Sequence, residues 1–151
     1  MIPMKKFKFR LQPLVNYKEA VERVQREELR LAQFKLRELR EEESRLLGAY
    51  VDNERSLEEA LVRNENVAQV LSEHDAYFRF LRDAIKIVKA RIIEAEESVA
   101  NCQEKLIFTM KELKTYDKIL GEQYSEYLGE VKAEEEKNMG DIVSFQTIHS
   151  A

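Results

Sequence analysis

Hydrophobic residues recur along this chain at alternating steps of three and four, the spacing of the heptad repeat in coiled coils. In the first half, Leu29 takes position a and Ala32 position d, and the repeat extends to about residue 71. In the second half, Phe78 takes position a and Leu81 position d, with a more continuous apolar pattern as far as Tyr127. The pattern predicts two long amphipathic helices, each with one narrow apolar seam.

Two helices of similar length joined by a short turn bury their seams by folding back on each other. The fold class predicted is all-α, with two long helices forming an antiparallel coiled-coil hairpin. Ser72 or Asp75 would cap the second helix, since their side-chain oxygens accept backbone hydrogen bonds. The expected parts are a basic N-terminal tail (1–12), a first helix (about 13–71), a turn (72–76), a second helix (77–138) and a C-terminal tail (139–151).

Two residues indicate the outer ends of the helices, and the position of the turn sets the register between them. Pro13 suits the first turn of a helix and Gly140 suits helix termination. A turn near residue 74 places Leu36 opposite Leu113 and Tyr50 opposite Val99.

Three polar residues interrupt the first seam: Glu43, Asn53 and Asn64. Polar seam residues reduce burial but fix register and partner, which is the interpretation we favour. The alternative is that a weakened seam lets the two helices open.

Composition supports long helices, because 36% of the residues are charged and the chain has only four Gly, two Pro and no Trp. Cys102 is the only cysteine, so no intrachain disulfide or cysteine pair for a metal is available, and a reducing cytoplasmic setting is expected. No apolar run approaches the roughly 18 residues of a membrane span. The chain is expected to be soluble and intracellular.

Little in the sequence suggests catalysis. The two histidines, His74 and His149, lie far apart in the sequence, and Cys102 sits at a seam position where a thiol packs as a small hydrophobe. The acidic runs are typical of solvated helix faces. The sequence holds no phosphate-binding loop and no metal-ligand spacing, so neither an enzyme nor a cofactor is expected.

Two clusters are candidate binding surfaces. The N-terminal head alternates cations with apolar residues from Lys5 to Leu11; it fits docking on a protein, and single-stranded nucleic acid or a membrane are the alternatives. The second cluster is Tyr77-Phe78-Arg79-Phe80-Leu81, whose rings are either exposed anchors or a cap on the core.

Resemblance to a known family lies at both ends. The opening of FliJ-family proteins resembles Lys6-Phe7-Lys8-Phe9-Arg10-Leu11-Gln12-Pro13-Leu14 followed by Tyr17-Lys18-Glu19, and their closing stretch resembles Glu136-Lys137-Asn138-Met139-Gly140-Asp141-Ile142. The family implies a coiled-coil stalk of the flagellar type III export apparatus, similar to the central subunit of rotary ATPases. Implied partners are the hexameric export ATPase FliI, the export gate protein FlhA and export chaperones. Nucleic acid is not among them, and membrane association is indirect, at the cytoplasmic face of the inner membrane.

The resemblance also implies site residues. For the gate, the family places an aromatic residue, a Leu four residues later and an Ala three after that, which match Tyr77, Leu81 and Ala84, with Phe80 alongside. Some relatives carry His where this chain has Val88. For the ATPase, the family places both chain ends in the ring, which here implies Phe7, Phe9, Arg10, Leu11, Leu14, Tyr17, Tyr124 and Tyr127.

Two other functions compete with a stalk. A general coiled-coil tether or an export chaperone, acting without the ATPase, would use the same seam. An adaptor for membranes or nucleic acid would use the basic head, with strongly salt-dependent affinity.

Overall fold

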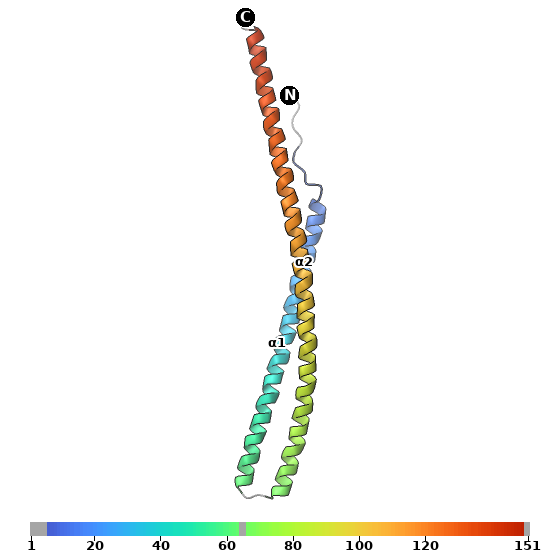
Figure 1. Ribbon diagram of the computed structural model, residues 1–151, viewed down its shortest axis with the longest axis vertical. Helices are drawn as coiled ribbons and strands as arrows, with labels where there is room; N and C mark the ends of the chain where they lie inside the picture. The colour runs from blue at the N-terminus through green and yellow to red at the C-terminus, as the bar shows by residue number, and fades with distance from the viewer. Residues whose placement is uncertain (1–5, 64–65, 150–151) are drawn as a thin grey trace. The chain divides into compact units, whose positions relative to one another are not determined.

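The computed structural model describes residues 6–63 and 66–149, with side chains up to residue 148. Two α-helices make up nearly all of this part: α1, Gln12–Val62, and α2, Val67–His149. The described part holds no strand. The helices are antiparallel and pack on each other (Figure 1), which confirms the predicted all-α helical hairpin.

The contacts divide the chain into two compact units, which we describe separately. The turn-side unit comprises residues 24–106, and the terminal unit comprises residues 1–23 and 107–151. In each unit, one stretch of α1 lies beside one stretch of α2.

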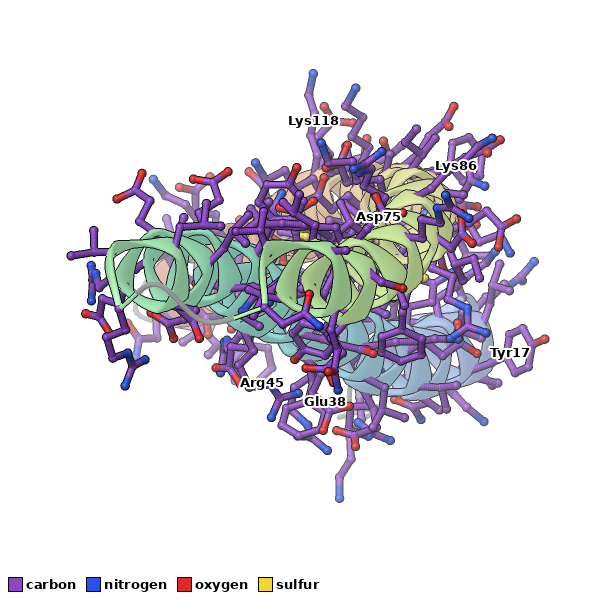
Figure 2. All side chains as sticks on the ribbon, turned by 90° about the horizontal axis from the view of Figure 1, so that it is seen from below. Tyr17, Glu38, Arg45, Asp75, Lys86 and Lys118 are labelled. Atoms are coloured by element: carbon purple, nitrogen blue, oxygen red, sulfur yellow. The ribbon has the colours of Figure 1, made fainter. Side chains whose placement is uncertain are left out.

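The core of the turn-side unit is a narrow seam between the helices. Leu36 packs against Val88, Ile92 and Ala95, all at predicted a or d positions and all less than 9% exposed. Burying each large aliphatic side chain stabilises the fold by about 1.5–3 kcal/mol. Charged side chains such as Glu38, Arg45 and Lys86 point away from the helices (Figure 2), as expected for a pair that buries one stripe per helix.

The turn lies ten residues earlier than predicted. α1 ends at Val62, α2 begins at Val67, and the expected turn at 72–76 is wrong because it lies inside α2. Asn66 acts as the helix cap: its side-chain oxygen lies 3.5 Å from the backbone nitrogen of Gln69. The predicted first helix is therefore too long at its end, and the second begins too late.

The predicted register is wrong for the same reason. Leu36 packs with Ile92 instead of Leu113, and the Tyr50 ring lies 4.8 Å from that of Phe78 instead of meeting Val99. In both cases the observed partner precedes the predicted one by 21 residues, which is three heptads. Because a shift by whole heptads again aligns position a with position a, the hydrophobic pattern fits both registers and the turn decides between them.

A polar layer crosses the seam of the turn-side unit. The Asn53 side-chain amide, in a residue 9% exposed, donates a hydrogen bond to the backbone carbonyl of His74 at 3.2 Å. The His74 Nδ1 atom lies 2.8 Å from the carbonyl oxygen of Val70, so Nδ1 carries the hydrogen, while Nε2 lies 3.3 Å from the Ser56 hydroxyl. Of the other polar seam residues, Glu43 is half-buried and Asn64 lies outside the described residues.

In the terminal unit, α2 continues to His149. The prediction of a C-terminal tail beginning at residue 139 is therefore wrong for residues 139–149, which are helical. Gly140 does not end the helix, because one glycine costs a helix only about 1 kcal/mol relative to alanine. Lys18 on α1 and Glu112 on α2 form an ion pair at 3.1 Å. Of the predicted N-terminal tail, residues 1–5 lie outside the described residues.

Candidate functional site

The N-terminal segment of residues 6–11, which we call the arm, lies against α2 in the terminal unit. The Phe7 ring makes an edge-to-face contact with Tyr124 at 5.1 Å and a tilted contact with Tyr127 at 5.4 Å. Phe9 is only 6% exposed. The arm joins α1 through a turn in which the backbone N–H of Gln12 donates to the carbonyl of Phe9 at 3.1 Å.

The other side of the arm is cationic. Lys6, Lys8 and Arg10 are all exposed, while Phe7 between them is half-buried and Phe9 is buried. This alternation of burial has the period of two that an extended backbone gives. The aromatic residues therefore hold the arm on α2, and the three cations form a row that faces solvent.

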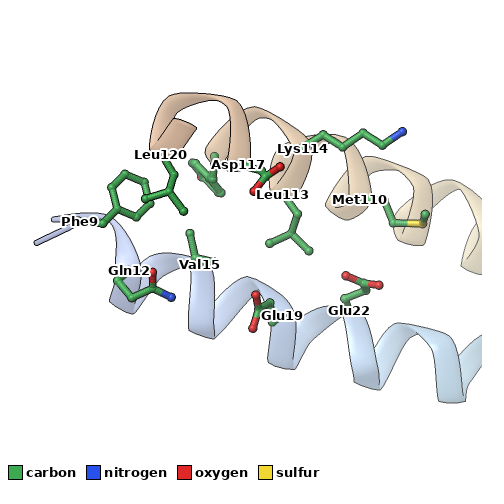
Figure 3. A pocket seen from close by; sticks show the side chains of 11 residues that line it. Phe9, Gln12, Val15, Glu19, Glu22, Met110, Leu113, Lys114, Asp117 and Leu120 are labelled. Carbon is green, nitrogen blue, oxygen red and sulfur yellow. The ribbon is translucent and has the colours of Figure 1, made fainter. Parts of the chain in front are cut away.

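A groove lies beside the arm, between the two helices of the terminal unit. It encloses about 460 Å³, and Figure 3 shows Phe9, Val15 and Leu120 among its lining residues. The acidic residues Glu19 and Asp117 also line it, from α1 and α2 respectively. The terminal unit thus places an apolar, acid-bordered groove next to a cationic arm.

A second exposed surface lies on α2 in the turn-side unit. The rings of Tyr77 and Phe80 stack with centroids 6.3 Å apart at an interplanar angle of 19°. Tyr77 is 44% exposed and Phe80 63% exposed, while Ala84 is half-buried. Ile87 is 52% exposed and follows Phe80 by seven residues, so it lies on the same helix face. Ile87 is absent from the sequence-based prediction, although the heptad spacing would have indicated it.

One local ion pair shifts protonation equilibria at the surface. The Arg30 guanidinium donates hydrogen bonds to the Glu27 carboxylate at 2.6 and 3.0 Å. This hydrogen bonding lowers the pKa of Glu27 and raises that of Arg30 from their ordinary values. Because both side chains are solvated, the pair belongs to the exposed face of α1 and forms no chemical site.

A metal-ligand cluster and a membrane-spanning helix are both absent from the part of the chain that the structure describes. Residues 6–63 and 66–149 contain no cluster of three or more His, Cys, Asp or Glu side chains that could hold a metal ion. Over the same residues, neither helix has a stretch that is both long and apolar enough to cross a membrane.

Comparison with known proteins gives the family. The family model described as flagellar FliJ protein matches residues 7–151, which is nearly the whole chain. The chain belongs to the FliJ family. Searches of curated proteins and of solved structures each gave no match. As a FliJ-family member, the chain is a component of the flagellar export apparatus.

The residues implied for ATPase contact in this FliJ-family chain take different positions. The structure brings Phe7 together with Tyr124 and Tyr127, whose rings contact one another, and Tyr124 is still 46% exposed. Leu14 is 38% exposed, and Tyr17, at 64%, points away from the helices (Figure 2). Phe9 and Leu11 are respectively buried and half-buried, so both offer little surface, and Arg10 is exposed.

The residues implied for gate binding also divide. Tyr77 and Phe80 are exposed, but Leu81 is 1% exposed and lies in the core of the turn-side unit. The FliJ-family spacing therefore combines surface residues with one residue that supports the helix pair. Val88, where some relatives carry His, is 2% exposed, and an apolar side chain suits that position.

Proposed function

We propose that this FliJ-family chain is a non-enzymatic stalk of the flagellar export apparatus, located in the cytoplasm at the face of the inner membrane. Its terminal unit binds the export ATPase ring FliI, and its turn-side unit binds the gate protein FlhA. The family supplies the export role, and the two exposed surfaces support the two contacts.

The arm is the observation that carries this proposal. Phe7 is already packed on α2 and Phe9 is already buried, so the row of Lys6, Lys8 and Arg10 is ordered before any partner arrives. A preorganised surface loses little conformational entropy on binding. Three adjacent cations select an acidic surface, and the attraction speeds association.

The gate contact uses Tyr77 and Phe80. Exposed aromatic side chains with few rotatable bonds are common anchors in protein interfaces, because they bury a large area at low entropic cost. Both rings lie on α2, as do Tyr124 and Tyr127 beneath the arm. A single helix therefore carries both proposed contact regions, which supports a coupling role.

The test is the hydrolysis rate of the purified export ATPase, titrated with the full chain. We expect the chain to change this rate. Reversing three charges together, Lys6→Glu, Lys8→Glu and Arg10→Glu, should weaken the effect at least about tenfold. The matched control reverses three exposed cations of the turn-side unit, Arg82→Glu, Lys86→Glu and Lys89→Glu, and should leave the effect intact. A wild-type chain without any effect at every ratio would refute the ATPase contact.

A second candidate function is that of a chaperone-binding tether, favoured by one observation. Val24 and Leu31 lie seven residues apart on α1 in the turn-side unit and are 59 and 52% exposed. Such a stripe fits a partner helix laid along it. On this alternative, the chain binds export chaperones without changing ATPase activity, and Val24→Glu abolishes that binding.

A further inference from the structure

The last turns of α2, residues 128–148, form what we call the helix tip. Figure 1 shows α2 continuing past the start of α1 at Gln12 within the terminal unit. Leu128, Ile142 and Phe145 of the tip are 48, 52 and 61% exposed, and Val131 is half-buried. At about 1.5 Å per residue, this exposed segment is about 30 Å long.

The tip carries an apolar stripe of its own. The a and d positions that face α1 farther down the helix are occupied in the tip by Glu130, Glu134, Lys137 and Asp141. The apolar residues have moved to a neighbouring face of the helix. That face is formed by Leu128, Val131, Glu135, Asn138, Ile142 and Phe145, at steps of three and four.

We propose that two copies of this chain pair through their helix tips, antiparallel, about a two-fold axis between residues 136 and 137. The stripe has the same spacing in both directions, so this axis makes it complementary to itself. Val131 then lies opposite the partner's Ile142, and Leu128 opposite the partner's Phe145. Because of the two-fold axis, each of these residue pairs occurs twice in the dimer.

The centre of the stripe specifies the direction. In the antiparallel arrangement, the Asn138 side-chain amide donates a hydrogen bond to the carboxylate of the partner's Glu135, and the two-fold axis repeats this bond. A hydrogen bond to a charged acceptor is among the stronger ones. Parallel pairing would instead place the two Glu135 carboxylates together, and like charges at facing positions repel. A polar layer of this kind fixes register at some cost in stability.

The size of the interface predicts a weak dimer. A seam about 30 Å long and one helix wide buries on the order of 1,000 Å² in total, at the lower end for specific interfaces. On one flank, Glu134 lies near the partner's Asp141, which weakens pairing at low salt. Added salt should therefore strengthen this dimer, whereas it weakens association between opposite charges.

The first experiment is cysteine cross-linking of the full chain in a Cys102→Ser background. A mixture of the single variants Val131→Cys and Ile142→Cys should give a disulfide-linked heterodimer under mild oxidation. Either variant alone should give little, because two copies of residue 131 are offset by 11 residues, or about 16 Å, beyond the reach of a disulfide. Linkage of Val131→Cys to itself would show parallel pairing and overturn the proposal, as would a mixture that remains unlinked.

The second experiment is sedimentation equilibrium of the unmodified chain from about 10 μM to 1 mM, a range suited to a weak dimer. The average mass should rise with protein concentration. It should rise more steeply in 0.5 M than in 0.05 M salt, because the higher salt screens the repulsion between the acidic side chains of the two copies. Ile142→Asp should keep the chain monomeric. Gly140→Ala, which lies outside the stripe in open space, should strengthen pairing severalfold by favouring the helix. A constant monomer mass would overturn the proposal, and because this test needs no ATPase, its failure would leave the coupling proposal standing.

Discussion

The side chain of Asn53 on α1 is hydrogen-bonded to the backbone carbonyl of His74 on α2, across an otherwise largely apolar seam. The donor belongs to a residue that is 9% exposed, so its amide has given up most of its contact with water. A buried amide is satisfied only where an acceptor lies opposite, so this layer favours one alignment of the helices over its neighbours.

Replacing Asn53 tests this layer. Asn53→Ala removes the donor and leaves a small cavity, so we expect a loss of about 1–2 kcal/mol in the free energy of unfolding. Asn53→Leu replaces the amide by an apolar side chain of similar size and should keep or raise stability. Thermal unfolding followed by circular dichroism measures both, with Gln33→Ala at an exposed position as the control. Equal losses from both substitutions would contradict a polar layer retained for alignment.

Cross-linking tests the register itself. Arg40 and Glu96 form an ion pair at 3.4 Å across the helices of the turn-side unit. In a Cys102→Ser background, Arg40→Cys with Glu96→Cys should be joined by a short bismaleimide linker. Arg40→Cys with Asp117→Cys, the pair that a three-heptad shift would bring together, should not be joined. Efficient linkage of the second pair would restore the register predicted from the sequence.

Two neighbouring residues on α2 should respond in opposite ways. Leu81→Ala opens a cavity in the core and should lower the free energy of unfolding by about 3 kcal/mol. Phe80→Ala removes an exposed ring and should change stability by less than about 0.5 kcal/mol. If the gate contact is correct, Phe80→Ala should nevertheless weaken binding to the gate protein about tenfold or more. Calorimetry of both variants, with and without that protein, separates folding from binding.

The arm can be released without unfolding the helices. Phe7→Ala removes the ring contacts with Tyr124 and Tyr127, each worth about 0.5–1.5 kcal/mol beyond burial. Trypsin should then cleave after Lys8 and Arg10 roughly tenfold faster, while the midpoint of thermal unfolding falls by only about 2–4 °C for each kcal/mol lost. Tyr124→Phe keeps the ring and should cleave at the wild-type rate. Equal protection in Phe7→Ala would show that Phe9 alone holds the arm.

The heptad pattern correctly predicted the seam residues of the turn-side unit. Leu36, Val88, Ile92 and Ala95 are buried as expected, since an apolar stripe on a helix must face another apolar surface. The turn was not predictable in the same way, because Asn66 is one of several polar residues able to cap a helix. The sequence pointed to candidate binding residues by their chemical type, but it did not predict which of them are exposed.

The sequence by itself determined that this chain forms two long helices with one seam each, that the arm alternates cations with apolar residues, and that it belongs to the FliJ family. Only the tertiary structure decided which heptads face each other, because a periodic pattern is unchanged by whole-repeat shifts and the position of the turn is not periodic. It also decided which side of the arm remains available to a partner. Phe7 packs on α2 and Phe9 is buried, while Lys6, Lys8 and Arg10 remain in water.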